Sequence, residues 1–426
     1  MHILFLTDNF PPEMNAPASR TFEHAKRWVA AGARVTVVTC FPNFPAGKIF
    51  PGYRNRFYQR EVMDGIEVVR VWSYVTANEG FIKRTLDYLS FLPPAVIASL
   101  FISRPNVVVA TSPQFFCAVA GFFVSRLKRR PFVFELRDLW PDSIVAVGAM
   151  KESFPLKMLR RLEYYLYRKA TRIVSLTHSF KTVLTNNGIP ADKIVVVPNG
   201  ADLDAYQPGE RPDALATKIG IENKFVAAYV GTIGMAHGLE TLLKTAAQLR
   251  HRSDIAFVLV GPGAQKDELE QLAKEQKLDN IFFVGPVTKT EVKAYWRLAD
   301  VALVLLKDVP LFQHVIPSKM FEAMSTEKPI ILGVRGESQG ILEKSRAGIV
   351  IPPEDDVALS EAILKLADDR EMRETMGKAG RQFVTTHFDR DQLAKEMLFH
   401  MANACGISPQ TGEINFRSVR LSGNRE

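Results

Sequence analysis

Residues 314–322 hold the side chains best suited to binding a phosphate and a sugar. Pro317 suits the first position of a helix, which would place Ser318 and Lys319 in the first turn. The helix dipole favours an anion at a helix start and disfavours a lysine. The position of Lys319 is therefore best explained if the side chain faces a bound diphosphate. Glu322 lies on a neighbouring face and could accept hydrogen bonds from a ribose diol. The alternative is a solvated Ser-Lys pair beside a surface glutamate.

Two glycine-containing turns follow apolar runs in the same half of the chain. A Gly-rich turn that opens a helix lets backbone N–H groups approach a phosphate. The first turn, after residues 225–230, contains Gly231, Thr232, Gly234 and His237, and the second, after 255–260, contains Gly261 and Gly263. Such turns are often only structural, and for the second turn the structural interpretation is the favoured one.

In the first half of the chain, charged and polar side chains also follow apolar runs. Arg137 and Asp138 come directly after residues 132–136. A charged pair is unfavourable in a hydrophobic core, but it suits a cleft that binds a polar ligand. Glu13 and Asn15 follow the first run, and Ser112 follows another. An Arg-Asp pair that only ties two loops together is the alternative.

The elements that must position these residues read as parallel strands alternating with helices. Most of the apolar runs are rich in Val and Ile without period-two alternation, so we expect strands with both faces buried. This βαβα pattern predicts an α/β protein with two doubly wound, Rossmann-like sheets. The runs are 3–7, 35–40, 66–71, 107–110, 132–136, 172–177, 194–197, 225–231, 255–261, 281–285, 301–306, 329–333 and 348–351.

The domain boundaries follow from turn signals. A break near Pro198-Asn199-Gly200 predicts a first domain over 1–204 and a second over 205–384. Residues 355–404 read as helical, and a helix at about 385–404 is expected to complete the first domain. Residues 407–426 lack periodicity and are expected to be disordered. Ligands bind beyond the carboxyl ends of parallel strands, so two facing sheets would form an interdomain cleft.

Composition excludes several classes of protein. The 426 residues are 47% hydrophobic and 23% charged, which rules out a disordered tail protein, a collagen-like chain and a disulfide mini-scaffold. The three cysteines are far apart, with no CxxC and no histidine cluster at metal spacing, so we expect no structural zinc. No secretory leader pattern opens the chain. The 21 uncharged residues between Arg104 and Arg126 read as a strand, a turn and a helix, not as a membrane span.

At this point the motifs resemble those of a known family. The chain is similar over about residues 1–405 to the retaining glycosyltransferases of family 4, which have a GT-B fold. The resemblance rests on residues 197–202 (VPNGAD), 231–238 (GTIGMAHG), 260–263 (VGPG) and 317–324 (PSKMFEAM), with Lys328-Pro329. Residues 137–143 (RDLWPDS) further resemble a bacterial branch that builds surface polysaccharides and includes UDP-dependent N-acetyl-L-fucosamine transferases.

The resemblance implies roles for the donor-binding residues. Glu322 matches the second Glu of the family's E-x7-E motif and would bind the ribose, while the first Glu is replaced here by His314. The family's phosphate-binding Arg and Lys correspond to Thr232 and His237, so both cations are missing unless His237 is protonated. Diphosphate neutralisation is therefore assigned to Lys319, to Ser318 and to the N–H groups of the helix start and the glycine loops. Pro286 and Val287 would contact the base.

The resemblance also implies the chemistry. A nucleotide sugar is the donor, the anomeric configuration is retained, and neither a metal nor another cofactor is required. Arg137-Asp138 occupies the place of the family's His-Asp pair near the reacting centre. Arg137 cannot act as a base, so Asp138 is expected to orient or deprotonate the acceptor hydroxyl. Glu13, Asn15 and Ser112 are candidates to line the acceptor site.

The charge distribution points to the acceptor. Residues 1–205 hold 26 Lys and Arg against 16 Asp and Glu, whereas the rest hold 28 against 30. Residues 81–103 carry many large apolar side chains, and residues 151–172 carry seven Lys and Arg with three tyrosines. We expect a cytoplasmic protein on the anionic inner face of the plasma membrane that takes a polyprenyl-diphosphate-linked saccharide, with no role for nucleic acid. An ordinary buried helix pair beside a solvated basic face is the alternative.

Two other functions remain open from the sequence. A GT-B-like nucleotide-sugar 2-epimerase would share the cleft and the diphosphate site, but it would need neither the 317–322 segment nor a basic first half. A non-catalytic, glycosyltransferase-like scaffold would account for the missing loop cations and for His314.

Overall fold

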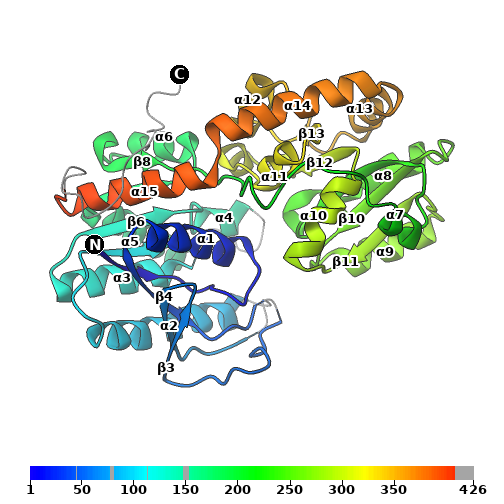
Figure 1. Ribbon diagram of the computed structural model, residues 1–426. Coiled ribbons are helices and arrows are strands. Elements are labelled where there is room, and N and C mark those ends of the chain that lie inside the picture. Colours follow the sequence, from blue (N-terminus) through cyan, green and yellow to red (C-terminus); the bar gives the residue numbers. More distant parts are fainter. Residues whose placement is uncertain (45, 77–80, 113, 147–152, 408–426) are drawn as a thin grey trace. The chain divides into compact units, whose positions relative to one another are not determined.

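The computed structural model describes residues 1–44, 46–76, 81–112, 114–146 and 153–407. The chain forms two compact units (Figure 1). The N-terminal unit comprises Met1–Pro198 and the chain from Asp391 onward, and the C-terminal unit comprises Asn199–Arg390. Each unit is an α/β domain built on one sheet, as the strand and helix pattern predicts.

The sheet of the N-terminal unit has eight strands in the order β3-β4-β2-β1-β5-β6-β7-β8. All neighbours pair in parallel except β3 and β4. Every residue of β1, β5 and β6 is buried, which explains why these strands read as continuous apolar runs. The strands are β1 (His2–Leu6), β2 (Arg34–Cys40), β3 (Tyr58–Met63), β4 (Ile66–Val71), β5 (Val107–Thr111), β6 (Phe132–Leu136), β7 (Arg172–Ser175) and β8 (Ile194–Val196).

Strand β3 is the strand that the sequence analysis missed. It lies at the edge of the sheet, pairs antiparallel with β4, and has no buried residue. Its sequence, Tyr-Gln-Arg-Glu-Val-Met, carries charges because an edge strand keeps one side in water. The other thirteen strands lie where the apolar runs predict them.

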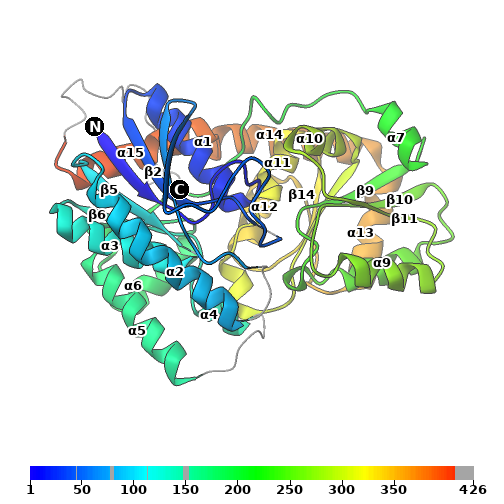
Figure 2. The same cartoon turned by 90° about the horizontal axis from the view of Figure 1, so that it is seen from below.

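Helices cover both faces of the N-terminal sheet (Figures 1 and 2). Helix α1 begins at Ala16 because the Asn15 side chain accepts the N–H of Ala18, and the chain turns away at Gly32, which has a φ of 92°. Its Trp28 packs with β1, β2 and α15 in one cluster. The helices are α1 (Ala16–Ala30), α2 (Phe81–Leu100), α3 (Phe115–Lys128), α4 (Asp142–Ala146), α5 (Phe154–Lys169), α6 (His178–Asn186), α15 (Arg390–Ala404) and the 3-10 turn Ala191–Lys193.

The C-terminal unit is a fully parallel sheet of six strands in the order β11-β10-β9-β12-β13-β14. Along β9, Val226, Ala228 and Val230 join one apolar cluster, while Ala227 and Tyr229 join another. Both faces are therefore covered, as a doubly wound sheet requires. The strands are β9 (Phe225–Val230), β10 (Ile255–Val260), β11 (Ile281–Gly285), β12 (Val301–Leu305), β13 (Ile330–Gly333) and β14 (Gly348–Val350).

Most helices of the C-terminal unit follow its strands. In α10 the Thr288 hydroxyl accepts the N–H of Glu291, whose carboxylate accepts the N–H of Thr288, a capping box that fixes the first residue of the helix. The helices are α7 (Asp213–Ile219), α8 (Glu240–Gln248), α9 (Lys266–Glu275), α10 (Lys289–Leu298), α11 (Lys319–Ser325), α12 (Glu337–Ser345), α13 (Asp356–Asp368), α14 (Arg370–His387) and the 3-10 turns Met235–His237 and Pro310–His314.

The chain passes between the two units at the turn signal in the sequence, Pro198-Asn199-Gly200. The division falls after Pro198 rather than after residue 204, because Ala201 donates its N–H to Phe388 and pairs with Asp389. The segment after Pro198 is thereby bonded to the end of the C-terminal unit. The chain returns to the N-terminal unit at Asp391, within α15, where the sequence analysis expected a helix over about 385–404.

Residues 355–404 form three successive helices, α13, α14 and α15, as expected. None of the helices in the described part of the chain is long and apolar enough to cross a membrane. The expected disordered tail lies almost wholly outside the described residues, which end at Ile407.

Candidate functional site

The helix that carries Lys319 and Glu322 begins later than the sequence suggested. Helix α11 starts at Lys319, with Ser318 as the N-cap, so Pro317 precedes the cap instead of occupying the first helical position. The Ser318 side chain makes no capping hydrogen bond. Ser318 therefore lies just before the first turn in which the sequence analysis placed it, and Lys319 is the first helical residue.

The ammonium of Lys319 is buried without a hydrogen-bond partner in the described part of the chain. It lies 3.7 Å from the centre of the Tyr229 ring, which supplies a cation–π contact. A side chain at Gly231 would come within 3.0 Å of this nitrogen, so Lys319 reaches directly under the glycine turn after β9. Burial lowers the pKa of Lys319 to about 7, although the nearby Glu322 carboxylate opposes the shift. A buried ammonium without a hydrogen-bond partner is unfavourable, and a bound anion would remove that cost.

His237 does not replace the missing loop cation by protonation. Burial, and next the charge of Lys319, lowers the pKa of His237 to about 3, so the ring is neutral near pH 7. Its Nδ1 lies 3.3 Å from the carbonyl oxygen of Leu305, and its ring meets the Tyr229 ring edge to face at 5.7 Å. His237 therefore acts there as a neutral hydrogen-bonding group.

Several N–H groups of the glycine turns donate hydrogen bonds to carbonyls at the ends of neighbouring strands. Gly231 donates to the carbonyl of Val260, and Gly261 donates to the carbonyl of Gly285. A side chain at Gly263 would come within 1.9 Å of the Ile233 carbonyl oxygen, so this glycine is required for contact between the turns. The N–H groups of Gly231 and Gly261, on which the sequence analysis counted, are already bonded. The turns thus have a structural role at the carboxyl ends of the strands.

Thr232 and Gly234 lie in the first of these turns. Their N–H groups have no hydrogen-bond partner within the described residues. They stand beside Gly231, whose turn covers Lys319. These two N–H groups are available for a ligand.

The carboxylate of Glu322 is held inside the C-terminal unit. Its Oε2 accepts the indole N–H of Trp296 at 3.0 Å. Burial raises the pKa of Glu322, while the Trp296 hydrogen bond, the charge of Arg390 and a hydrogen bond from Tyr206 oppose the rise. The sequence analysis missed Tyr229, Trp296, Tyr206 and Arg390. Tyr229 lies in an apolar run that reads as core, and the other three are distant in sequence from Glu322.

Three further predicted donor-site residues lie in loops that follow strands. His314 ends the 3-10 turn Pro310–His314 after β12 and is partly exposed. Pro286 is exposed and Val287 is partly buried, and both stand between β11 and the capping box of α10. Their loops all follow the carboxyl ends of strands in one sheet, which agrees with the rule used to select them.

In the N-terminal unit the structure brings Arg137, Ser112 and the start of α1 together. The backbone N–H of Arg137 donates to the Ser112 hydroxyl oxygen at 3.0 Å. The Arg137 guanidinium donates to the carbonyls of Pro17 at 3.3 Å and Ala16 at 3.4 Å, next to the cap residue Asn15. Burial lowers the pKa of Arg137 to about 10, which leaves it charged at neutral pH.

Asp138 follows Arg137 and stands before α4. Burial raises its pKa, while hydrogen bonds from the Ser143 side chain and the Leu139 N–H oppose the rise. A raised pKa makes the Asp138 carboxylate a stronger base than an exposed one, as proton transfer at the end of a parallel strand would require.

Two of the candidate acceptor residues are turned into the protein. Glu13 is 2% exposed, and its Oε1 accepts the N–H groups of Asn43 and Phe44, each at 2.8 Å. Burial raises the pKa of Glu13 to about 7. Ser112 is 1% exposed and is bonded to Arg137. Glu13 and Ser112 thus shape the loops around the site.

A buried ion pair supports this region and was missed from the sequence. Arg20 donates to Glu135 at 2.9 Å and to the carbonyls of Val197 and Pro198 at 3.1 and 3.0 Å. Burial alone would raise the pKa of Glu135, but the charges of Arg20 and Arg137 hold it below its usual value. Arg20 reads as part of an ordinary helix, so only its distant partners reveal its role.

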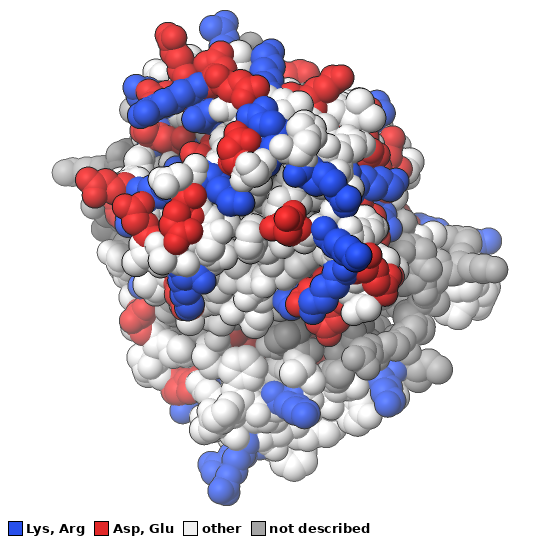
Figure 3. Space-filling model, turned by 90° about the vertical axis from the view of Figure 1, so that its right-hand side faces the viewer, with Lys and Arg blue, Asp and Glu red and all other residues white. Residues whose placement is uncertain are grey.

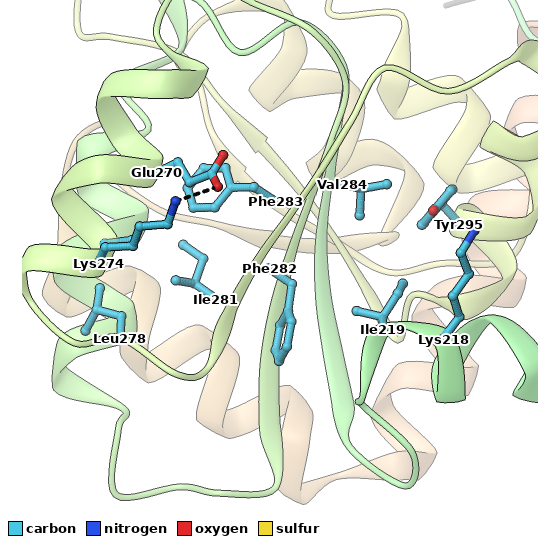
Figure 4. Close-up of a pocket in the computed structure, with 11 residues that line it drawn as sticks. Lys218, Ile219, Glu270, Lys274, Leu278, Ile281, Phe282, Phe283, Val284 and Tyr295 are labelled. Atoms are coloured by element: carbon cyan, nitrogen blue, oxygen red, sulfur yellow. Dashed lines mark ion pairs between the residues drawn. The ribbon is translucent and has the colours of Figure 1, made fainter.

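A hollow of about 460 Å³ lies elsewhere, along the open edge of the C-terminal sheet (Figure 4). Its floor includes Phe282, Phe283 and Val284 of β11, and Lys218 and Lys274 stand at its sides. None of the predicted site residues lines it. It is the uncovered flank of an edge strand and is separate from the turns around Lys319.

Both units match families of known proteins. The family described as "Glycosyl transferase 4-like domain" matches residues 15–200, and the family "Glycosyl transferases group 1" matches residues 213–383. The putative colanic acid biosynthesis glycosyl transferase WcaI of Escherichia coli K12 is 25% identical over 329 residues, which cover 75% of this chain and 80% of WcaI.

Solved structures share the fold. Sucrose-phosphate synthase of Thermosynechococcus elongatus superposes with a TM-score of 0.76 and 18% identity, covering 96% of this chain and all of that one. HepE of Anabaena, solved with UDP-glucose, has a TM-score of 0.71 and 18% identity over 95% of this chain and all of HepE. The expected fold is confirmed. The N-terminal unit thus matches the 4-like domain and the C-terminal unit matches the group 1 family, and the chain is a glycosyltransferase of the GT-B fold.

Proposed function

We propose that the protein transfers a sugar from a UDP-linked donor to a polyprenyl-diphosphate-linked saccharide, with retention of configuration and without a metal ion. The observation that carries the donor half is the buried, unpartnered ammonium of Lys319 beneath the Gly231 turn. A bound diphosphate would supply the hydrogen-bond acceptors that this nitrogen lacks in the protein. The solved structure of HepE with UDP-glucose supports UDP as the nucleotide.

The donor would be held by groups with separate roles. Lys319, with Ser318 and the N–H groups of Thr232 and Gly234, binds the diphosphate in this proposal. Glu322 serves the ribose, with its carboxylate held in place by Trp296 and Tyr206. His314 approaches the donor sugar, while Pro286 and Val287 contact the base.

The chemical step then follows from charge. The bond between the anomeric carbon and the diphosphate oxygen breaks through an oxocarbenium-like state, and negative charge grows on the diphosphate. The ammonium of Lys319 stabilises that charge in a site with little water, where electrostatic stabilisation is largest. The acceptor hydroxyl attacks on the face that the diphosphate leaves, and its proton passes to Asp138 or to the departing diphosphate oxygen. Arg137 orients this region.

The acceptor half of the proposal rests on the basic first half of the chain and on the relative WcaI, whose name refers to colanic acid biosynthesis. We propose a role in bacterial surface-polysaccharide assembly, as in O-antigen or capsule. The transferred sugar is an N-acetylated amino or deoxy sugar, and the protein works in the cytoplasm at the inner face of the plasma membrane.

The test is chromatography of a panel of nucleotide sugars incubated with the protein and a bacterial lipid extract, with and without EDTA. We expect UDP release that requires both protein and lipid and that persists in EDTA. Lys319→Met should abolish it, while the matched control Lys344→Met, at an exposed position of α12, should not. A new nucleotide-sugar isomer formed without lipid would replace the proposal with an epimerase, and GDP release would replace the donor.

A further inference from the structure

Three helices of the N-terminal unit present apolar side chains where a water-facing surface is normally polar. On α2 the exposed positions recur every three or four residues, so they form one stripe along the helix. Helices α3 and α5 add further exposed apolar side chains. The exposed large apolar residues of this region are Leu86, Leu89, Ile97, Leu100, Phe101, Phe123, Leu127, Phe154, Met158, Leu162 and Tyr165.

These side chains belong to one surface. The rings of Phe122 on α3 and Tyr165 on α5 meet edge to face at 5.8 Å. Lys128 of α3 donates to the carbonyls of Leu100 and Ile102 at the end of α2. Figure 2 shows α2, α3 and α5 side by side on one face of the N-terminal sheet. We call the exposed side of these three helices the α2–α3–α5 face.

Outside this face, exposed large apolar side chains are fewer. In the N-terminal unit they lie in loops and in the edge strand β3, and they are Met14, Phe44, Phe57, Tyr58, Val62 and Tyr74. In the C-terminal unit the exposed large apolar side chains are Met235 and Val357. Figure 3 shows a side of the molecule on which, over the C-terminal unit, acidic and basic side chains are interspersed. A large contiguous apolar surface on a folded domain marks an interaction site.

The charges on the α2–α3–α5 face have one sign. Lys83 and Arg104 stand near the two ends of the α2 stripe, and Arg126 and Arg161 stand beside the apolar side chains of α3 and α5. Among the described residues of these helices no Asp or Glu is exposed. Exposed apolar side chains with basic neighbours and no acidic ones suit a surface of anionic headgroups over acyl chains.

We propose that the α2–α3–α5 face binds an anionic lipid bilayer, with the three helices lying in the plane of the interface. The apolar stripes enter the boundary between headgroups and acyl chains, and the surrounding cations pair with phosphate groups. A second copy of the chain fits less well, because a two-fold contact would bring Arg126 and Arg161 against like charges. The inference deepens the proposed function by assigning its membrane partner to defined residues, and it does not involve the donor site.

The test measures sedimentation of the full chain with vesicles that contain no acceptor lipid. One vesicle is pure phosphatidylcholine and the other contains about one-third phosphatidylglycerol. We expect binding to the anionic vesicle to exceed binding to the neutral one about tenfold or more, and to fall steeply in about 0.5 M salt. Equal or absent binding to both vesicles overturns the proposal.

Paired variants separate the apolar and charged contributions. Ile97→Ser with Phe101→Ser should lower binding about tenfold or more, and Arg126→Glu with Arg161→Glu should do the same. The matched controls, at exposed positions outside the face, are Val62→Ser with Val357→Ser, and Lys344→Glu with Lys365→Glu, and these should bind like the unaltered protein. Every variant is first checked for unaltered circular dichroism and UDP affinity. Control and test variants that bind alike would overturn the proposal.

A depth measurement and a mass measurement complete the test. Phe101→Trp should be quenched by brominated acyl chains, whereas Val357→Trp should not. A dimer in analytical ultracentrifugation that disappears in Ile97→Ser with Phe101→Ser, without vesicle binding, would assign the face to a second copy instead. UDP release with a water-soluble acceptor analogue reports on the proposed function separately, so failure of either proposal is recognised without the other.

Discussion

Lys319 meets two opposing demands at the scale of single residues. Burial disfavours its charge, while the Tyr229 ring and the Glu322 carboxylate oppose that cost. A diphosphate would favour the charged form strongly. Because the pKa of Lys319 is lowered to about 7, the free protein is only partly charged at this position near neutral pH. Donor binding is therefore expected to take up a proton.

Calorimetry in buffers of different ionisation enthalpy measures that proton. Above pH 7 we expect UDP binding to take up close to one proton per site, and below pH 6 the uptake should approach zero because Lys319 is already charged. The affinity for UDP should accordingly fall as the pH rises above about 7. Lys319→Met should bind UDP about 100-fold more weakly or worse and show no uptake. Unchanged uptake in this variant would assign the proton to another group.

Asp138 offers a second test at the residue scale. Asp138→Asn should lower the transfer rate about 100-fold or more and leave UDP affinity unchanged. Ser143→Ala removes a hydrogen bond that holds the pKa of Asp138 down, so the acidic limb of the pH–rate profile should move to higher pH. If Asp138 only supports α4, Asp138→Asn will lower the melting temperature and Ser143→Ala will leave the profile in place.

At the scale of elements, the turns after β9 and β10 hold the donor site by backbone contact. Gly261 has a φ of 137°, and a side chain there would lie 2.1 Å from the carbonyl oxygen of Gly231. A side chain at Gly263 would meet the Ile233 carbonyl at 1.9 Å. These glycines let the two turns close on each other above the strands.

Gly263→Ala should therefore lower the free energy of unfolding by about 2–4 kcal/mol, because backbone atoms must move to admit one methyl group. Urea unfolding of the C-terminal unit measures this change. The control is Gly340→Ala in α12, where nothing lies within 4 Å of the added carbon. That substitution should be neutral or stabilising by about 1 kcal/mol. Similar losses in both variants would contradict the steric argument.

The loop that follows β2 depends on Glu13. Since burial raises the pKa of Glu13 to about 7, the folded protein holds more protons at this carboxyl than the unfolded chain between pH 4.5 and 7. The contribution of Glu13 to stability therefore falls as the pH rises through this window. Glu13→Gln keeps an oxygen acceptor for Asn43 and Phe44 without the charge. At pH 8 the variant should gain about 1–3 kcal/mol relative to its difference at pH 4.5, as measured by thermal unfolding across pH.

At the scale of the whole molecule, the chain runs between its two units twice. It enters the C-terminal unit after Pro198 and leaves it at Arg390. These crossings lie side by side, because Ala201 and Asp389 pair and the Arg390 side chain donates to the carbonyl of Gly200 at 2.7 Å. The N-terminal unit is therefore completed by a helix from the far end of the sequence.

Removal of α15 should unfold the N-terminal unit selectively. Leu393, Met397 and Met401 pack into its core, and Trp28 donates its indole N–H to the carbonyl of Ala394 at 2.8 Å. A chain ending at Arg390 should lose hydrogen-exchange protection in β1, β2 and β5 and keep it in the C-terminal unit. A chain ending at Ile407 retains every described residue and serves as the control. Loss of protection in both units would mean that they fold as one.

Much of this architecture was predictable because it repeats a local rule. Buried parallel strands need apolar side chains on both faces, so they appear as short Val- and Ile-rich runs wherever they lie. Strand β3 was not predicted because its pairing with β4, and not its amino-acid composition, makes it a strand. The start of α11 was placed two residues too early because proline suits several positions before a helix as well as the first.

The sequence by itself determined the two-sheet architecture, the positions of the turns beyond each strand and the presence of Lys319 and Glu322 at one helix start. These follow from periodicity and neighbouring residues, which a chain carries along its length. Only the tertiary structure decided that the Lys319 ammonium has no hydrogen-bond partner among the described residues, that His237 is neutral and that Glu13 and Ser112 turn inward. It also decided that apolar residues of α2, α3 and α5 share one exposed face. Burial and partnership depend on which distant segments meet, and spacing along the chain does not contain that information.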